Sequence, residues 1–135
     1  ILRRYAELKG CEIGGEIMPR LIDEIPILAV AAMFATGKTI ISGAEELRVK
    51  ETDRLHAVAI EFGKMGAVIE EKTDGLVIEG GHSLHEATCF AHHDHRIAMS
   101  LAIAGSAARG VTIEGADCVE ISYPDFYEVL ARFAQ

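Results

Sequence analysis

The feature that most constrains the fold of this chain is an internal repeat. Two stretches follow the same order of an apolar helical segment, a glycine, a short β-branched strand ending in Gly-Ala, and a second helical segment with one charged face. The first stretch comprises residues 27–36, Gly37, 39–44 and 51–65, and the second comprises residues 96–108, Gly110, 111–116 and 125–133. Two copies of one supersecondary unit explain this order most simply.

The repeat predicts which helices lie inside the molecule. Residues 27–36 and 96–108 are apolar on nearly every side, so these two helices need cover all round. Residues 51–65 and 125–133 have a single apolar face, which places them on the outside. A glycine-rich loop is expected at residues 10–19, ahead of the first apolar helix.

A hairpin completes the first copy, because two strand-like segments, 67–71 and 76–79, flank the turn sequence KTDG at residues 72–75. The second copy stops after its outer helix, so it lacks two strands if the copies are equivalent. We therefore predict an α/β (α+β) fold of repeated units, with unit one at about residues 1–80 and an incomplete unit two at about residues 81–135.

The charge balance excludes several classes of partner. With 21 acidic and 13 basic residues the net charge is −8, which repels the phosphates of nucleic acids and anionic lipids. The longest apolar runs, at residues 27–35 and 97–105, are far shorter than the roughly 20 residues that span a bilayer. We expect no nucleic-acid partner and no membrane association.

The cysteines and the first residue suggest where the chain belongs. Cys11, Cys89 and Cys118 are odd in number and form no CxxC pair, so neither a disulfide framework nor a zinc site is indicated. Free thiols are typical of the cytoplasm. The chain begins at Ile1 without a signal-peptide pattern, and we interpret it as a piece of a longer protein.

Charged side chains gather where three predicted helices begin, at residues 23–24, 50–54 and 94–96. Lys50 and Arg54 are four residues apart and should share one side of a helix, with Glu51 nearer its apolar face. A carboxylate between two cations suits acid-base chemistry on a bound anion. The alternative is a solvated i,i+4 charge pattern on an exposed face.

Arg96 and Asp23 each allow two interpretations. Arg96 begins a helix with almost no other polar side chain, so its guanidinium either binds a carboxylate or phosphate or forms a structural salt bridge with Asp94 or Glu24. Asp23 stands where the N-cap of the first apolar helix belongs, so its carboxylate either caps this helix or takes part in a site at the charged helix beginnings. Pro26 is tolerated in the first turn of the helix.

Two other patterns carry no site. GKT at residues 37–39 resembles the end of a P-loop, but it follows a helix and enters a strand, the reverse of the required order. The five histidines between positions 82 and 95 match no metal-ligand spacing. We expect solvated loop histidines and no metal site.

Four segments form longer motifs: LRVKETDRL at residues 47–55, DHRIAM at 94–99, PRLIDEIP at 19–26 and SYPDF at 122–126. These motifs resemble those of the 5-enolpyruvylshikimate-3-phosphate (EPSP) synthase family. The segments occur in the family's order over nearly the whole chain. RVKETDRL is long and specific, and the related enolpyruvyl transferase of cell-wall synthesis lacks it.

The resemblance implies a transferase of the shikimate pathway, which serves aromatic amino-acid biosynthesis. The enolpyruvyl group of phosphoenolpyruvate passes to the 5-hydroxyl of shikimate 3-phosphate and phosphate is released, without a cofactor or an obligatory metal. The enolpyruvyl transferase fold has two domains of three βαβαββ units each, which close over the substrates. This chain resembles a C-terminal part of one domain, whose last unit is completed by strands from the beginning of the protein. Alone it is expected to be inactive, and the complete protein to be a monomer.

Roles follow for the residues that match the family's motifs. The resemblance implies that Asp23 contacts the attacking hydroxyl of shikimate 3-phosphate and takes its proton. Lys50 would touch both substrates, and Glu51 would protonate and later deprotonate the methylene carbon. Arg54 and Arg96 would bind phosphoenolpyruvate.

Three further positions bear on the substrates. His95 matches a histidine of the pocket, where hydrogen bonding and orientation are expected rather than proton transfer. Ile121 stands where many family members have a lysine that binds phosphoenolpyruvate, and Glu46 stands where some have an asparagine near the shikimate ring. Two functions remain as alternatives: a non-catalytic repeat domain that binds small anions, and a related enolpyruvyl transferase.

Overall fold

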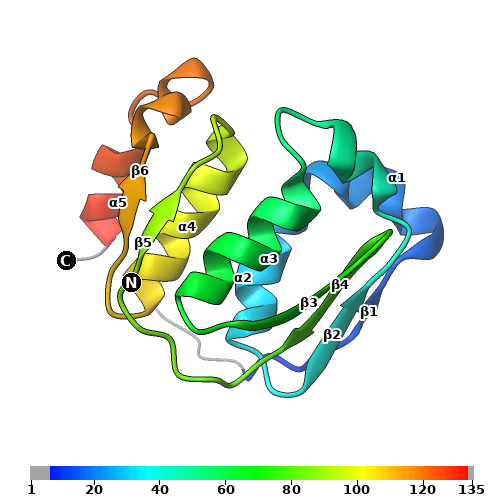
Figure 1. Ribbon diagram of the computed structural model, residues 1–135. Coiled ribbons are helices and arrows are strands. Elements are labelled where there is room, and N and C mark those ends of the chain that lie inside the picture. The colour runs from blue at the N-terminus through cyan, green and yellow to red at the C-terminus, as the bar shows by residue number, and fades with distance from the viewer. Residues whose placement is uncertain (1–6, 134–135) are drawn as a thin grey trace.

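The computed structural model describes residues 7–133, in which the strands form two sheets (Figure 1). A four-stranded sheet has the order β1-β2-β4-β3, and a second sheet pairs β5 with β6. The strands are β1 (Glu12–Ile13), β2 (Lys38–Ile41), β3 (Val68–Lys72), β4 (Gly75–Glu79), β5 (Thr88–Phe90) and β6 (Thr112–Glu114). The predicted mixture of helices and strands is confirmed.

Helices connect these strands, and α2, α3 and α4 pack between the two sheets (Figure 1). The α-helices are α1 (Met18–Leu21), α2 (Ile25–Met33), α3 (Arg54–Lys64), α4 (His95–Ala107) and α5 (Phe126–Phe133), and the 3-10 helices are η1 (Gly15–Ile17), η2 (Ile22–Glu24), η3 (Glu45–Val49) and η4 (Ala116–Ile121). α2 and α3 cover one face of the four-stranded sheet, and α4 packs against these two helices (Figure 1).

The two apolar helices form the interior, as the repeat predicts. α2 packs against α4, and it also contacts β4, while α4 contacts β6. α2 is covered on most sides, although Ala31 and Phe34 are exposed. The residues of these two helices that are no more than 4% exposed include Ile25, Ala29, Val30, Met33, Ile97, Leu101 and Ala104. The outer helix α5, in contrast, buries none of its residues.

The repeat is visible in the strand pairing and in the turns. β1 pairs with β2 in parallel, and β5 pairs with β6 in parallel. After β2 and after β6, a glycine takes a left-handed conformation, with φ of 70° at Gly43 and 76° at Gly115, and a 3-10 helix follows. Residues with a Cβ rarely adopt this conformation, which explains why both copies keep Gly-Ala at this position.

The predicted hairpin is present. β3 and β4 are antiparallel with Lys72 opposite Gly75, so Thr73 and Asp74 form a two-residue turn. A Cβ at Gly75 would lie 1.7 Å from the carbonyl oxygen of Ile41. The close approach of β2 to β4 therefore requires glycine at this position.

Parts of the predicted element map are wrong. β1 lies in a segment expected to be a loop, and β5 was not expected at all. α2 ends at Met33, before the expected residue 36, because the amide of Thr36 donates to the carbonyl of Leu8 and continues the pairing of β1 with β2. Strand pairing thus takes these residues out of the helix.

Two further findings concern the described residues as a whole. No helix within residues 7–133 is both long and apolar enough to cross a membrane. Cys11, Cys89 and Cys118 are all free thiols, of which Cys89 is buried.

Candidate active site

Arg54, the first residue of α3, is the centre of a charged network that joins η2, the segment before α3 and the beginning of α4. Its side chain is almost fully buried, at 2% exposure. It donates to Asp94 through Nε at 2.7 Å, to Asp23 through Nη1 at 3.1 Å, and to Glu51 through Nη2. A guanidinium this deeply buried needs such partners, so the interpretation as a solvated charge pattern is wrong for Arg54.

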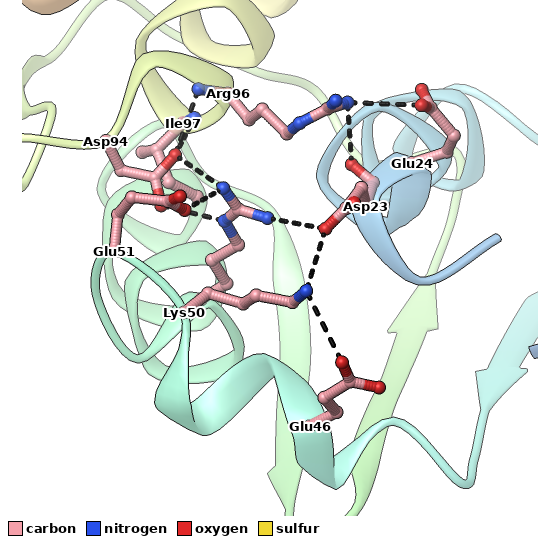
Figure 2. A network of polar contacts seen from close by, with 9 residues as sticks. Asp23, Glu24, Glu46, Lys50, Glu51, Asp94, Arg96 and Ile97 are labelled. Atoms are coloured by element: carbon pink, nitrogen blue, oxygen red, sulfur yellow. Dashed lines mark hydrogen bonds and ion pairs between the residues drawn. The ribbon is translucent and has the colours of Figure 1, made fainter. Parts of the chain in front are cut away.

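Lys50 forms the other link to Asp23, with Nζ 3.3 Å from Asp23 Oδ1 and 3.4 Å from Glu46 Oε1 (Figure 2). Partial burial disfavours the charged form of Asp23, but the hydrogen bond and charge of Lys50, with the charges of Arg96 and Arg54, outweigh burial and hold the pKa of Asp23 below its usual value. The same hydrogen bond raises the pKa of Lys50. Both groups are therefore charged at neutral pH.

Arg96 reaches across from α4 to the segment before α2. Its Nη1 donates to the carbonyl oxygen of Asp23 and to Glu24 Oε1, both at 3.1 Å (Figure 2). The predicted salt bridge with Glu24 is present, whereas that with Asp94 is not. The Arg96 side chain remains 34% exposed, so its guanidinium keeps a face that an anion can approach.

Asp94 ties the beginnings of two helices together. It is fully buried, and its Oδ1 accepts the backbone amides of Arg96 at 2.9 Å and Ile97 at 3.3 Å as the N-cap of α4. The same carboxylate binds Arg54, a contact that the sequence analysis missed, because nothing in the sequence shows that the two helix beginnings meet.

The predicted route by which Lys50 and Glu51 enter the site is wrong. α3 begins at Arg54, not at residue 51, because Asp53 is its N-cap and accepts an amide of the first turn. Lys50 and Glu51 lie in irregular backbone between η3 and α3. They reach the network from this loop and not from one face of a helix.

Asp23 is not a helix cap, so the interpretation of this residue as the N-cap of the first apolar helix is wrong. It lies within η2, and the N-cap position of α2 is Glu24, whose side chain makes no capping hydrogen bond. Pro26 in the first turn of α2 needs no amide partner. The carboxylate of Asp23 is therefore available to Lys50 and Arg54.

The remaining predicted residues lie at the edge of the network. His95 is the first residue of α4 and half-buried, and no hydrogen bond or ion pair within residues 7–133 joins its ring to the network. Glu46 contacts Lys50, and Ile121 is 81% exposed at the end of η4. Over the same residues, no group of three or more His, Cys, Asp or Glu side chains is placed to hold a metal ion.

A groove of about 220 Å³ opens beside Arg96, between the beginning of α2, the first three turns of α4 and the residues around the beginning of α5. Its floor is apolar, and Asp23 and Glu24 border it together with Arg96. The apolar and aromatic lining residues are Pro26, Ile27, Met99, Ile103, Tyr123 and Phe126. Arg96 is the cation of this lining, so the groove can hold an anion there with the carboxylates of Asp23 and Glu24 beside it.

Known proteins resemble the chain over almost its full length. Residues 2–130 match the family model described as EPSP synthase (3-phosphoshikimate 1-carboxyvinyltransferase). The 3-phosphoshikimate 1-carboxyvinyltransferase of Gloeobacter violaceus is 62% identical over 133 residues, which cover 98% of this chain and 31% of the relative. The enzyme of the same name from Thermoanaerobacter sp. is 57% identical over 126 residues, covering 93% and 30%.

Solved structures give the same result. A structure of EPSP synthase from Acinetobacter baumannii superposes with a TM-score of 0.88 at 40% identity, over 93% of this chain and 30% of that one. The chain belongs to the EPSP synthase family. It spans 30–31% of the length of the two curated relatives named above.

Proposed function

We propose that this chain is part of an enzyme that transfers the enolpyruvyl (carboxyvinyl) group of phosphoenolpyruvate to the 5-hydroxyl of shikimate 3-phosphate and releases phosphate. The observation that carries the proposal is the meeting of Asp23, Lys50, Glu51 and Arg54, from two distant segments, beside Arg96. The names of the relatives, 3-phosphoshikimate 1-carboxyvinyltransferase, support it.

The cations would bind phosphoenolpyruvate. This substrate carries a phosphate and a carboxylate, and both suit the planar fork of a guanidinium. Arg96 offers its exposed face, and Arg54 is held in one orientation by Asp94. Charges that are fixed before the substrate arrives stabilise a transition state without reorganisation.

The carboxylates would move the protons. Asp23 is charged at neutral pH and would take the proton of the 5-hydroxyl of shikimate 3-phosphate. At the same time the hydroxyl oxygen bonds to the substituted carbon of phosphoenolpyruvate. Glu51 would give a proton to the neighbouring methylene carbon in this addition and take it back as phosphate leaves. Lys50, which contacts Asp23, would bind both substrates.

The proposal also covers the protein around this chain. Residues 1–80 and 81–135 would be one complete and one incomplete βαβαββ unit in the C-terminal part of a domain, and the rest of the enzyme would supply the strands that complete the second unit. The rest would also hold the 3-phosphate of shikimate 3-phosphate. The complete protein would be a cytoplasmic monomer.

The test uses the complete protein and the Glu51→Gln variant. Phosphate release from phosphoenolpyruvate is measured with and without shikimate 3-phosphate, and the variant is expected to bind both substrates but to turn over about 10² to 10⁴ times more slowly, as for loss of a general acid-base group. Glu128→Gln is the matched control, because Glu128 also pairs with an arginine, Arg132 at 2.9 Å, but on the surface. Unchanged turnover in Glu51→Gln would remove Glu51 from the mechanism, and release independent of shikimate 3-phosphate would refute the reaction.

A further inference from the structure

A second buried carboxylate lies outside the charged network, two turns along α3 from Arg54. The side chain of Glu61 is 2% exposed and accepts three hydrogen bonds: from the amide of Phe90 at 2.9 Å, from Nε2 of His92 at 2.7 Å, and from Nζ of Lys64 at 2.8 Å. Burial disfavours its charge, but these donors outweigh burial and hold the pKa of Glu61 below its usual value. The proposed reaction makes no use of this carboxylate.

Two of these donors flank the beginning of the turn that leads from β5 into α4: Phe90 ends β5, and His92 lies in the turn. In this turn His92 and His93 both adopt left-handed backbone, with φ of 55° and 56°. Two consecutive residues with a Cβ rarely take this conformation, which persists only where the surroundings impose it. Glu61 contributes to that constraint, since it binds the residue at the end of β5, Phe90, and His92 in the turn itself.

The same turn leads directly to Asp94 and places its carboxylate beside Arg54. Arg54 and Glu61 are seven residues apart and so lie on the same face of α3, two helical turns from each other. α3 therefore binds the segment of residues 90–94 through two buried side chains: Glu61 contacts His92, and Arg54 contacts Asp94. Asp94 in turn caps the helix that carries Arg96.

We propose that Glu61 is a positioning residue for the binding of phosphoenolpyruvate, because it holds the turn through which Asp94 orients the guanidinium of Arg54 and caps the helix that carries Arg96. The proposal rests on the proposed function in assigning these two arginines to phosphoenolpyruvate. Glu61 acts through the turn and touches neither substrate. Its loss displaces Asp94, which loosens the guanidinium of Arg54 and the first turn of α4, where Arg96 lies.

The variants Glu61→Gln and His92→Gly each remove one side of the contact in the complete protein. Glu61→Gln keeps the volume of the side chain and removes the charge. His92→Gly removes the imidazole and also relaxes the left-handed backbone, so His93→Gly is its control, because it relaxes the adjacent residue and leaves the Glu61 contact in place. Glu70→Gln is the control for loss of a glutamate charge, since Glu70 pairs with Lys72 at 2.7 Å on the exposed strand β3.

Steady-state kinetics with each substrate varied in turn provide the first readout. The KM for phosphoenolpyruvate is expected to rise about tenfold in Glu61→Gln and His92→Gly, the scale of effect that a small misplacement of binding groups produces. The KM for shikimate 3-phosphate and both controls should stay near the wild-type values. A purely structural role would lower the thermal midpoint and the amount of active enzyme without changing the KM for phosphoenolpyruvate, and that outcome would overturn the proposal.

A second readout does not depend on turnover. In protein labelled with ¹⁵N-arginine, the Nε–H of Arg54 is buried against Asp94 and should exchange slowly with water. Faster exchange or a shifted resonance in Glu61→Gln and His92→Gly, but not in the controls, would support the positioning role even if the wild type releases no phosphate, which would refute the proposed function alone. An unchanged Arg54 Nε–H resonance in both variants would refute the positioning role.

Discussion

Removal of the Asp94 carboxylate is expected to destabilise the chain by about 4 kcal/mol. Breaking one side of a buried ion pair typically costs about 3 to 5 kcal/mol, because the other charge stays buried. Arg54 retains Asp23 and Glu51, whose side chains are 45% and 49% exposed, so the lower end of that range applies. Loss of the α4 cap adds about 1 kcal/mol.

Two substitutions separate these contributions. Asp94→Asn keeps an oxygen that can accept the amides of Arg96 and Ile97, so it should cost about 3 kcal/mol from the charge alone. Asp94→Ala loses both contributions. The free energy of unfolding is measured by urea denaturation followed by circular dichroism with linear extrapolation, which resolves differences of this size.

Asp53 offers a matched control, since it also caps a helix and also pairs with an arginine. Its carboxylate caps α3 and lies 2.9 Å from Arg48, but its side chain is 37% exposed. Asp53→Ala should therefore cost only about 1 to 2 kcal/mol. If Asp94→Ala costs no more than Asp53→Ala, burial of the Arg54 pair does not stabilise the site and the reasoning is wrong.

Two shorter predictions concern acid and the isolated chain. Because the folded-state pKa of Glu61 is lowered, its contribution to stability is present above the ordinary glutamate pKa of about 4.3 and is lost as pH falls through the folded value. The urea midpoint should therefore fall less steeply below pH 5 in Glu61→Gln than in the wild type, and equal slopes would contradict the assignment. The 135-residue chain should unfold cooperatively by itself yet release no phosphate from phosphoenolpyruvate with shikimate 3-phosphate, and turnover near that of the complete enzyme would show that the site is complete here.

The larger elements of the fold were predictable because their signals are long. The apolar segments and the KTDG turn fix α2, α4 and the hairpin from sequence alone. β1 and β5 were missed because strands of two and three residues show no periodicity. They exist because β2 and β6 offer parallel partners, and this is information about the tertiary structure.

Most members of the charged network around Arg54 could be named from the sequence, but its geometry could not. The motif RVKETDRL singles out Lys50, Glu51 and Arg54, but the pattern alone places them on an exposed helix face. Because Asp53 is the N-cap, α3 begins after Lys50 and Glu51. Asp94, 40 residues further along the chain, contacts Arg54 in the interior. Burial of a charge depends on such distant partners, which no local pattern reports.

The three carboxylates that bind Arg54 differ in their exposure to solvent. Asp94 is fully buried and holds Nε, so it can only orient the guanidinium. Asp23 and Glu51 are nearly half exposed, and they are also the groups to which the proposed mechanism gives the proton transfers. An arriving anion competes with them for the guanidinium. Neighbouring cations lower the pKa of Asp23, so this carboxylate becomes a better proton acceptor when it is released from them. Binding of phosphoenolpyruvate would thus leave Arg54 oriented by Asp94 while it frees Asp23 and Glu51 for the substrates.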